Sequence, residues 1–286
     1  MKAEAHSALP HDGTAEAHFS HYAAPLIDNA LACAAALRAN PDVEVLHKLR
    51  VSLRRLRSLL WAYQPLLDES FDDQQRTLFK FFADAAGKTR DWDILIALLG
   101  DIDGIDGTDA GTDAQNAPRE ALVAARAKTL DTSRETLEHA NVKTALRDAL
   151  KEANRELNTA HERTPLPKFA RKRLASAQKT MAKRMKRAAR AKRSDYASYH
   201  EVRKAGKKLR YLTEFFEPVL ASKQLKAIKA LKKIQKRFGE LNDVVASEQL
   251  LRDNPGVLAD EALTARALDA LSKERKQRMR AAAKLL

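Results

Sequence analysis

The sequence predicts an all-α protein with long helices, arranged as two duplicated halves. Its 286 residues are rich in Ala, Leu, Lys, Arg and Glu, which favour helices, and include only nine Gly and nine Pro. Apolar residues recur at three- and four-residue intervals over long stretches, as on helices that pack against a core. A basic pattern that begins at His47 also returns at His200, which indicates an internal duplication.

The first half is expected to begin with a flexible tail and three helices. Residues 1–14 carry Pro10 and Gly13 with little apolar periodicity, which favours a flexible tail. Helices are then predicted from about residue 16 to 39, 41 to 67 and 68 to 99. The first ends at Asn40-Pro41, because a residue before proline disfavours helical backbone. Long helices with short connections are typical of an antiparallel bundle.

The rest of the first half contains a loop and further helix. Residues 100–118 hold five Asp and several Gly without any Lys or Arg, which predicts a flexible acidic loop. Helical pattern resumes from about residue 119 to 163, with a break near Asn141. The sequence Thr-Pro-Leu-Pro at 164–167 ends this half. Residues 15–286 are therefore predicted to form one domain, with halves at about 15–163 and 164–286.

The second half opens with a strongly basic stretch. Residues 168–193 contain twelve Lys and Arg and no acidic residue. Leu174, Met181 and Met185 keep a helical spacing through this stretch, so an amphipathic basic helix is predicted. Further helices are expected at about 196–220, 223–251 and 258–285, with a turn at Asn-Pro-Gly, 254–256.

Two cationic stripes provide the candidate binding residues. Each copy begins with His and places cations three, seven, eight and ten positions later. At about 100° per residue, the selected positions of each copy share a narrow arc of their helix. This shared order predicts that the two stripes converge on one polyanion. The candidate residues are His47, Arg50, Arg54, Arg57, His200, Arg203, Lys207 and Arg210.

Charge and cysteine content limit the partners and the compartment. The chain has 52 Lys and Arg against 38 Asp and Glu, so its formal net charge is +14 and an anionic partner is expected. The one cysteine, Cys33, cannot form an intrachain disulfide and fits a reducing compartment. No stretch is apolar for long enough to span a bilayer. A cytoplasmic protein without membrane contact is predicted.

With these stripes, and with Arg90-Asp91 aligned on Asn242-Asp243, the chain resembles the CHAD family, an α-helical domain named for its conserved histidines. The resemblance covers the chain from about residue 15 to its C terminus. It implies two antiparallel four-helix bundles related by a pseudo-twofold axis. It also implies a basic channel between them that binds inorganic polyphosphate, and association with polyphosphate granules, where other granule proteins would be partners.

The resemblance assigns roles to particular residues. The eight stripe residues would contact polyphosphate, and Lys208, Lys232, Lys233 and Lys236 are secondary candidates. Asp84 and Ala85 stand where the second half has Lys236 and Arg237, so the two halves are not expected to contribute equally. A histidine beside phosphates should have a raised pKa, so affinity is expected to rise as the pH falls.

Two other functions compete with this interpretation. Nucleic-acid binding would use the basic helix over 168–193, but only 6% of the residues are aromatic and none lies in the stripes for base stacking. A polyphosphate-metabolising enzyme would need paired carboxylates, yet Asp91 and Asp93 should point apart on a helix. Gly87-Lys88-Thr89 lacks the spacing of a P-loop. No catalytic residue, metal site or cofactor is predicted.

Overall fold

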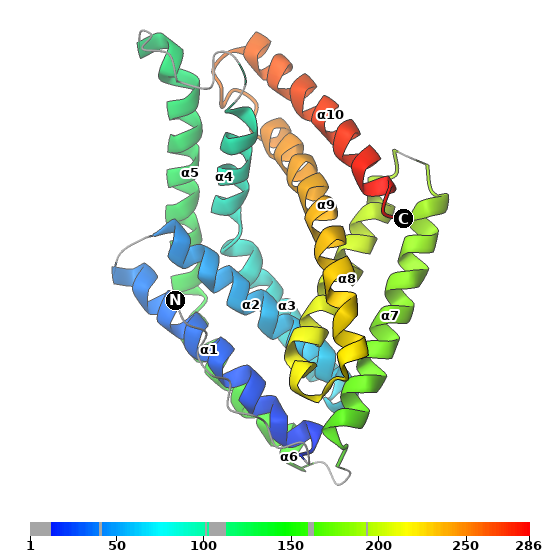
Figure 1. Ribbon diagram of the computed structural model, residues 1–286. Coiled ribbons are helices and arrows are strands. Elements are labelled where there is room, and N and C mark those ends of the chain that lie inside the picture. The colour runs from blue at the N-terminus through cyan, green and yellow to red at the C-terminus, as the bar shows by residue number, and fades with distance from the viewer. Residues whose placement is uncertain (1–12, 40–41, 101, 103–112, 160–162, 193) are drawn as a thin grey trace.

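A computed structural model describes residues 13–39, 42–100, 102, 113–159, 163–192 and 194–286, without the side chains of 113–116 and 222–230. The described residues form ten α-helices and two short 3-10 helices (Figure 1). They contain no strand, and Thr14 and Pro165 form an isolated β-bridge. The prediction of an all-α protein is therefore confirmed. Of the tail predicted at residues 1–14, residues 1–12 lie outside the described residues, whereas Gly13 and Thr14 make backbone contacts with Leu166 and Pro165.

Six α-helices precede Thr164 in the described part of the chain, and two of them begin at capping aspartates. The Asp42 carboxylate accepts a hydrogen bond from the Glu44 amide, and Asp68 accepts from Ser70 and Phe71. Asn141 has a φ of 46° and separates two helices where a break was predicted. The helices are α1 (Ala15–Ala39), α2 (Val43–Tyr63), α3 (Glu69–Ala85), α4 (Lys88–Leu99), α5 (Asp113–His139) and α6 (Val142–Thr159).

The prediction of a single helix over residues 68–99 is wrong, because α3 ends at Ala85 and α4 begins at Lys88. At this break the Arg50 guanidinium donates a hydrogen bond of 2.9 Å to the Gly87 carbonyl oxygen. A Cβ at Gly87 would lie 2.8 Å from Arg50 Cζ, so a larger residue there would require the Arg50 side chain to shift. The matching stretch of the second half stays helical, and nothing lies within 4 Å of a Cβ built at Gly239.

Four α-helices of the described chain follow Thr164, close to the predicted ranges. They are α7 (Leu166–Arg190), α8 (Tyr196–Phe216), α9 (Ser222–Asp253) and α10 (Glu261–Ala283). The backbone of Gly13–Ala15 bonds to that of Thr164 and Leu166, which ties the start of α1 to the start of α7. Helix α5 begins at Asp113, inside the range predicted as the acidic loop. The division into two four-helix bundles stays a prediction.

The hydrophobic core joins the two stripe helices. Helix α1 packs on α2 and α6, α7 packs on α8, and α9 packs on α8 and α10. Contacts between the halves run from α2 to α8 and from α4 to α9 (Figure 1). Tyr63 of α2 lies 5.1 Å from the ring of Phe169 and 6.4 Å from that of Phe216, measured between centroids. Because these rings are buried, they fix α2 against α7 and α8.

No helix among the described residues has both the length and the apolar character needed to cross a bilayer. The same residues contain no group of three or more His, Cys, Asp or Glu side chains placed to hold a metal ion.

Candidate functional site

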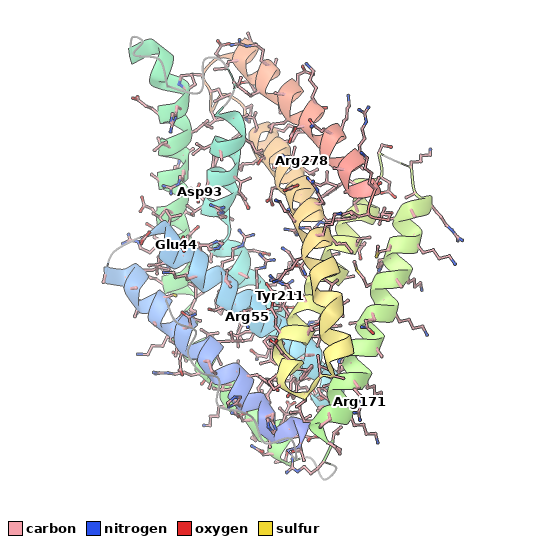
Figure 2. All side chains as sticks on the ribbon, viewed as in Figure 1. Glu44, Arg55, Asp93, Arg171, Tyr211 and Arg278 are labelled. Atoms are coloured by element: carbon pink, nitrogen blue, oxygen red, sulfur yellow. The ribbon has the colours of Figure 1, made fainter. Side chains whose placement is uncertain are left out.

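The structure brings the central cations of the two stripes together. Burial lowers the pKa of Arg54, and repulsion from Arg50 on its own helix and Arg203 on α8 lowers it further. Arg203 is also half-buried. Burial lowers its pKa, and repulsion from Arg50 lowers it further. Figure 2 labels Arg55 of α2 and Tyr211 of α8 near this meeting of the helices. The predicted convergence of the stripes is thus present for these residues.

Lys207 is the most strongly perturbed of these cations. Burial lowers its pKa to about 6, together with repulsion from Arg54, Arg203 and Arg50. An ammonium group in such surroundings loses hydration and faces like charges. These surroundings therefore disfavour the charged form of Lys207 in the ligand-free protein, and an anion placed here would favour its protonation.

Two carboxylates lie beside this group of cations. Asp91 of α4 pairs with Arg50 at 3.6 Å, and Asp243 of α9 acts on Arg203 and Lys207. Burial raises the pKa of Asp91, although Arg50 opposes the shift. Asp91 is therefore a partner of an arginine of the stripe. Two carboxylates among four closely placed basic side chains leave the site with excess positive potential.

The two histidines have different surroundings. His200 Nδ1 lies 3.2 Å from the Tyr196 hydroxyl and 3.2 Å from Asn242 Oδ1, and the Tyr196 hydroxyl donates to Asn242 Oδ1 at 3.0 Å. Burial lowers the pKa of His200, and Lys204 and Arg203 lower it further. His47 Nδ1 is buried without a hydrogen-bond partner among the described residues. The ring of His200 is therefore oriented by two neighbours.

The ends of the two stripes also differ. Arg57 lowers the pKa of both Arg54 and Lys208, so it lies within electrostatic range of the central cations and of Lys208. Arg210 instead pairs with Glu214 at 3.4 Å and lies over the Tyr211 ring at 4.7 Å. The charge of Arg210 already has a partner, whereas none of the ion pairs found among the described residues includes Arg57.

The secondary candidates are placed less closely. The Lys208 ammonium lies 4.5 Å from the centroid of the Trp61 ring. Lys232, Lys233 and Lys236 are exposed on α9. At about 100° per residue, Lys232 and Lys236 share a face with Asp243, whereas Lys233 lies further round the helix. The participation of these three lysines stays a prediction.

Sequence reasoning missed residues that position the site. Tyr196 and Asn242 orient His200, and Gly87 accepts a hydrogen bond from Arg50. The four-residue separation of Tyr196 and His200 is a signal that could have identified this pair, because such residues are neighbours on a helix. The fit of Arg50 against Gly87 joins residues 37 positions apart, and helical spacing carries no information about it.

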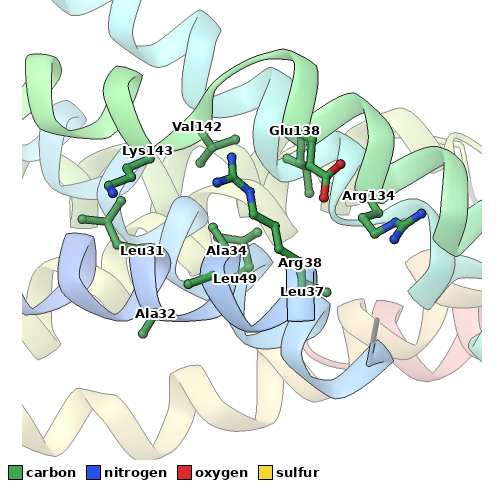
Figure 3. Close-up of a pocket in the computed structure, with 12 residues that line it drawn as sticks. Leu31, Ala32, Ala34, Leu37, Arg38, Leu49, Arg134, Glu138, Val142 and Lys143 are labelled. Carbon is green, nitrogen blue, oxygen red and sulfur yellow. The ribbon is translucent and has the colours of Figure 1, made fainter. Parts of the chain in front are cut away.

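Two hollows have charged side chains in their walls. One of about 570 Å³ opens beside His200 and includes Arg184, Arg187 and Tyr196 in its wall. Another of about 410 Å³ lies between α1, α2, α5 and α6, and Figure 3 shows Arg38 reaching toward Glu138 and Val142 there. Leucine and alanine side chains provide much of the second lining. Neither hollow is lined by cations alone, because the first also contains Asp195 and Glu201 and the second also contains Glu138.

Comparisons with known proteins identify a family and a fold. A family model described as "CHAD domain" matches residues 21–252. A search of curated proteins finds no match. The crystal structure of the CHAD domain from the plant Ricinus communis superposes with a TM-score of 0.75 at 23% identity, covering 98% of this chain and 95% of that one. PptA from Streptomyces chartreusis superposes with a TM-score of 0.65 at 16% identity, covering 96% and 98%.

Proposed function

Since this chain belongs to the CHAD domain family, we propose that the cations brought together by α2 and α8 bind inorganic polyphosphate. The supporting observation is the convergence of Arg50, Arg54, Arg203 and Lys207 from the two halves. The family resemblance implies the same ligand. On this proposal the protein is cytoplasmic, lies on polyphosphate granules and has other granule proteins as partners.

Polyphosphate suits these residue types. The polymer carries about one negative charge per phosphate and has no bases, so its receptor needs repeated donors along its path. Guanidinium groups offer paired donors that match phosphate oxygens, and an ammonium group adds a compact charge. His47 Nδ1 and Arg203 Nε are buried without hydrogen-bond partners among the described residues, so they are available to a ligand that reaches them.

A competition titration tests the proposal. Purified protein is titrated with long-chain polyphosphate, alone and with RNA at equal phosphate concentration, at two salt concentrations. We expect tight binding that weakens with salt, because bound cations release counterions, and little displacement by RNA. Displacement by RNA would favour the nucleic-acid alternative, for which the exposed cations of α7 would be the surface. Lack of binding to either polymer would refute the proposal.

The enzyme alternative has weaker support. Asp91 pairs with Arg50, whereas Asp93 pairs with Arg126. Their carboxylates thus have different partners, as expected for positions two apart on a helix. They do not form a shared site for a cation. Release of phosphate from polyphosphate in the presence of Mg²⁺ would contradict the binding-only interpretation.

Affinity for polyphosphate should rise as the pH falls from about 8 to 6. The pKa of Lys207 is about 6 in the ligand-free protein, and that of His200 is lowered. Bound phosphates would raise both pKa values, so the protein takes up protons on binding at a pH between its free and bound pKa values. Below the free pKa values both groups are already protonated, and the gain in affinity levels off. If bound phosphate raises one of these pKa values by one unit, we expect the affinity to increase by about tenfold across this pH range. Titrations at several pH values measure the effect.

Lys207→Arg provides the control for this dependence. Arginine stays protonated across the range, so the variant should lose the part of the pH dependence that Lys207 contributes. Calorimetry in buffers of different ionisation enthalpy should show fewer protons taken up by the variant than by the natural protein. Equal proton uptake by the two proteins would show that Lys207 is not the responsible group.

A further inference from the structure

A second group of cations surrounds Trp61 near the end of α2. Arg173 Cζ lies 4.7 Å and Lys208 Nζ lies 4.5 Å from the centroid of its ring. Arg173 also donates a hydrogen bond to the Trp61 carbonyl oxygen. Arg76 is near enough to lower the pKa of Lys208. We call these four residues the Trp61 cluster, to which α2, α3, α7 and α8 each contribute one side chain.

The Trp61 cluster carries more positive than negative charge. Arg76 pairs with the buried Asp72 at 3.0 Å and with the exposed Asp73 at 3.9 Å. None of the ion pairs found in the described part of the chain includes Arg173 or Lys208. Arg173 Nε is buried there without a hydrogen-bond partner. Burial and four neighbouring cations lower the pKa of Lys208 to about 8, whereas the carboxylate of Asp72 acts on Arg173 and Arg76.

The Trp61 cluster continues the row of central cations. Arg57 acts electrostatically on Arg54 at one end and on Lys208 at the other. Both Arg57 and Lys208 are partly exposed. A flexible polyanion that leaves Arg54 therefore meets Arg57 and then the Trp61 cluster without crossing an uncharged stretch.

The opposite side of the molecule lacks such a continuation. There Phe215 of α8 lies beside Arg55 of α2, at 5.8 Å, and beside Tyr22 of α1, at 6.2 Å. This arrangement mirrors Trp61 beside Lys208 of α8 and Arg173 of α7. Tyr22 carries no charge at neutral pH, and burial raises its pKa further, to about 12. Arg210, the counterpart of Arg57, pairs with Glu214.

From this asymmetry we propose that the Trp61 cluster is a second contact site for phosphate chains, which holds the part of a long chain that leaves the central cations on this side. The inference rests on the proposed function. Short chains would occupy the central cations alone, and long chains would occupy both sites. The Trp61 cluster would thus provide selectivity for chain length, through the added contacts of a linked second site.

The double variant Arg173→Gln, Lys208→Met tests this inference. It removes two charges and keeps side chains of similar length. Calorimetric titrations use long-chain polyphosphate and, as the short probe, tripolyphosphate. We expect the variant to lose about tenfold in affinity for the long chain, the typical effect of about two charge-assisted contacts, and less than about twofold for tripolyphosphate. The control is Arg171→Gln, Lys179→Met, which removes two exposed charges of α7 and should bind both probes like the natural protein.

Fluorescence provides a second measurement that does not depend on changing the Trp61 cluster. The chain has two tryptophans, and Trp92 lies in a separate part of the core with Leu95 and Leu251. In a Trp92→Phe variant, long-chain polyphosphate should change the emission of Trp61, and tripolyphosphate should not.

Three outcomes would overturn the inference. They are an equal loss for both chain lengths, no loss for the long chain, and an equal loss in the control variant. If the natural protein binds neither probe, the proposed function fails as well. If the natural protein binds both and the double variant is unchanged, only the inference about the Trp61 cluster fails.

Discussion

Changing His47, Arg50, Arg203 and Lys207 together to Ala should weaken the binding of long-chain polyphosphate by about three orders of magnitude. Each charged or hydrogen-bonded contact is worth about 1 kcal/mol or more, and four such losses approach 4 kcal/mol. The four side chains come from both stripes, and Arg50, Arg203 and Lys207 lie within electrostatic range of one another. Titration calorimetry measures the loss.

The helices should remain folded in this quadruple variant. The side chains replaced lie beside the core, whereas Leu49, Leu53 and Val202 on the same helices are fully buried and unchanged. Circular dichroism checks helicity. The matched control replaces Arg171, Lys172 and Lys179, three exposed cations of α7, and removes the same number of formal charges with histidine neutral. Comparable loss in the control would show that net charge, and not the proposed site, determines binding.

Changing Lys207 alone to Met should stabilise the ligand-free protein while it weakens polyphosphate binding. The lysine is packed among Arg54, Arg203 and Arg50, and its pKa of about 6 shows that the fold disfavours its charged form. Methionine fills similar space without a charge. We expect the free energy of unfolding to rise by about 2 kcal/mol at pH 7, since each unit of pKa shift corresponds to about 1.4 kcal/mol and relaxation reduces the total. Urea denaturation measures this change.

The sign of the pH dependence makes this prediction specific. Between a folded pKa of about 6 and an unfolded pKa of about 10.4, the unfolded chain binds the additional proton, so the stability of the natural protein rises with pH. The advantage of Lys207→Met should therefore be largest below pH 6 and should shrink as the pH approaches 10. Long-chain polyphosphate should stabilise the natural protein more than the variant. A destabilised variant would indicate that Lys207 stabilises the fold. It would contradict the interpretation that this lysine lowers stability and is retained for ligand binding.

These two variants test a relationship between stability and binding. A group of cations assembled without its ligand lowers stability, because like charges repel and burial removes hydration. Asp91 and Asp243 offset part of this effect. The remaining positive potential is available to a polyanion. The expected gain in stability on removing Lys207, with loss of binding, is what a site retained for function should show.

Several features of the fold follow from local sequence. Asp42 and Asp68 start helices because their carboxylates cap free amides, and Asn141 ends one through its positive φ. The pairing of His47 with His200 and their following cations predicted a shared face on two helices. The break between α3 and α4 was not predicted, and the contact of Gly87 with Arg50 of another helix cannot be derived from local spacing.

The sequence by itself determined that the protein is helical, which residues carry positive charge and on which side of each helix they lie, because these properties follow from composition and from a period of 3.6 residues. Only the tertiary structure decided which charges are close together. Packing of Tyr63 against Phe169 and Phe216 sets α2 against α8, and this placement lowers the pKa of Lys207. Burial and repulsion depend on distances between segments far apart in the chain, and helical periodicity contains no such distances.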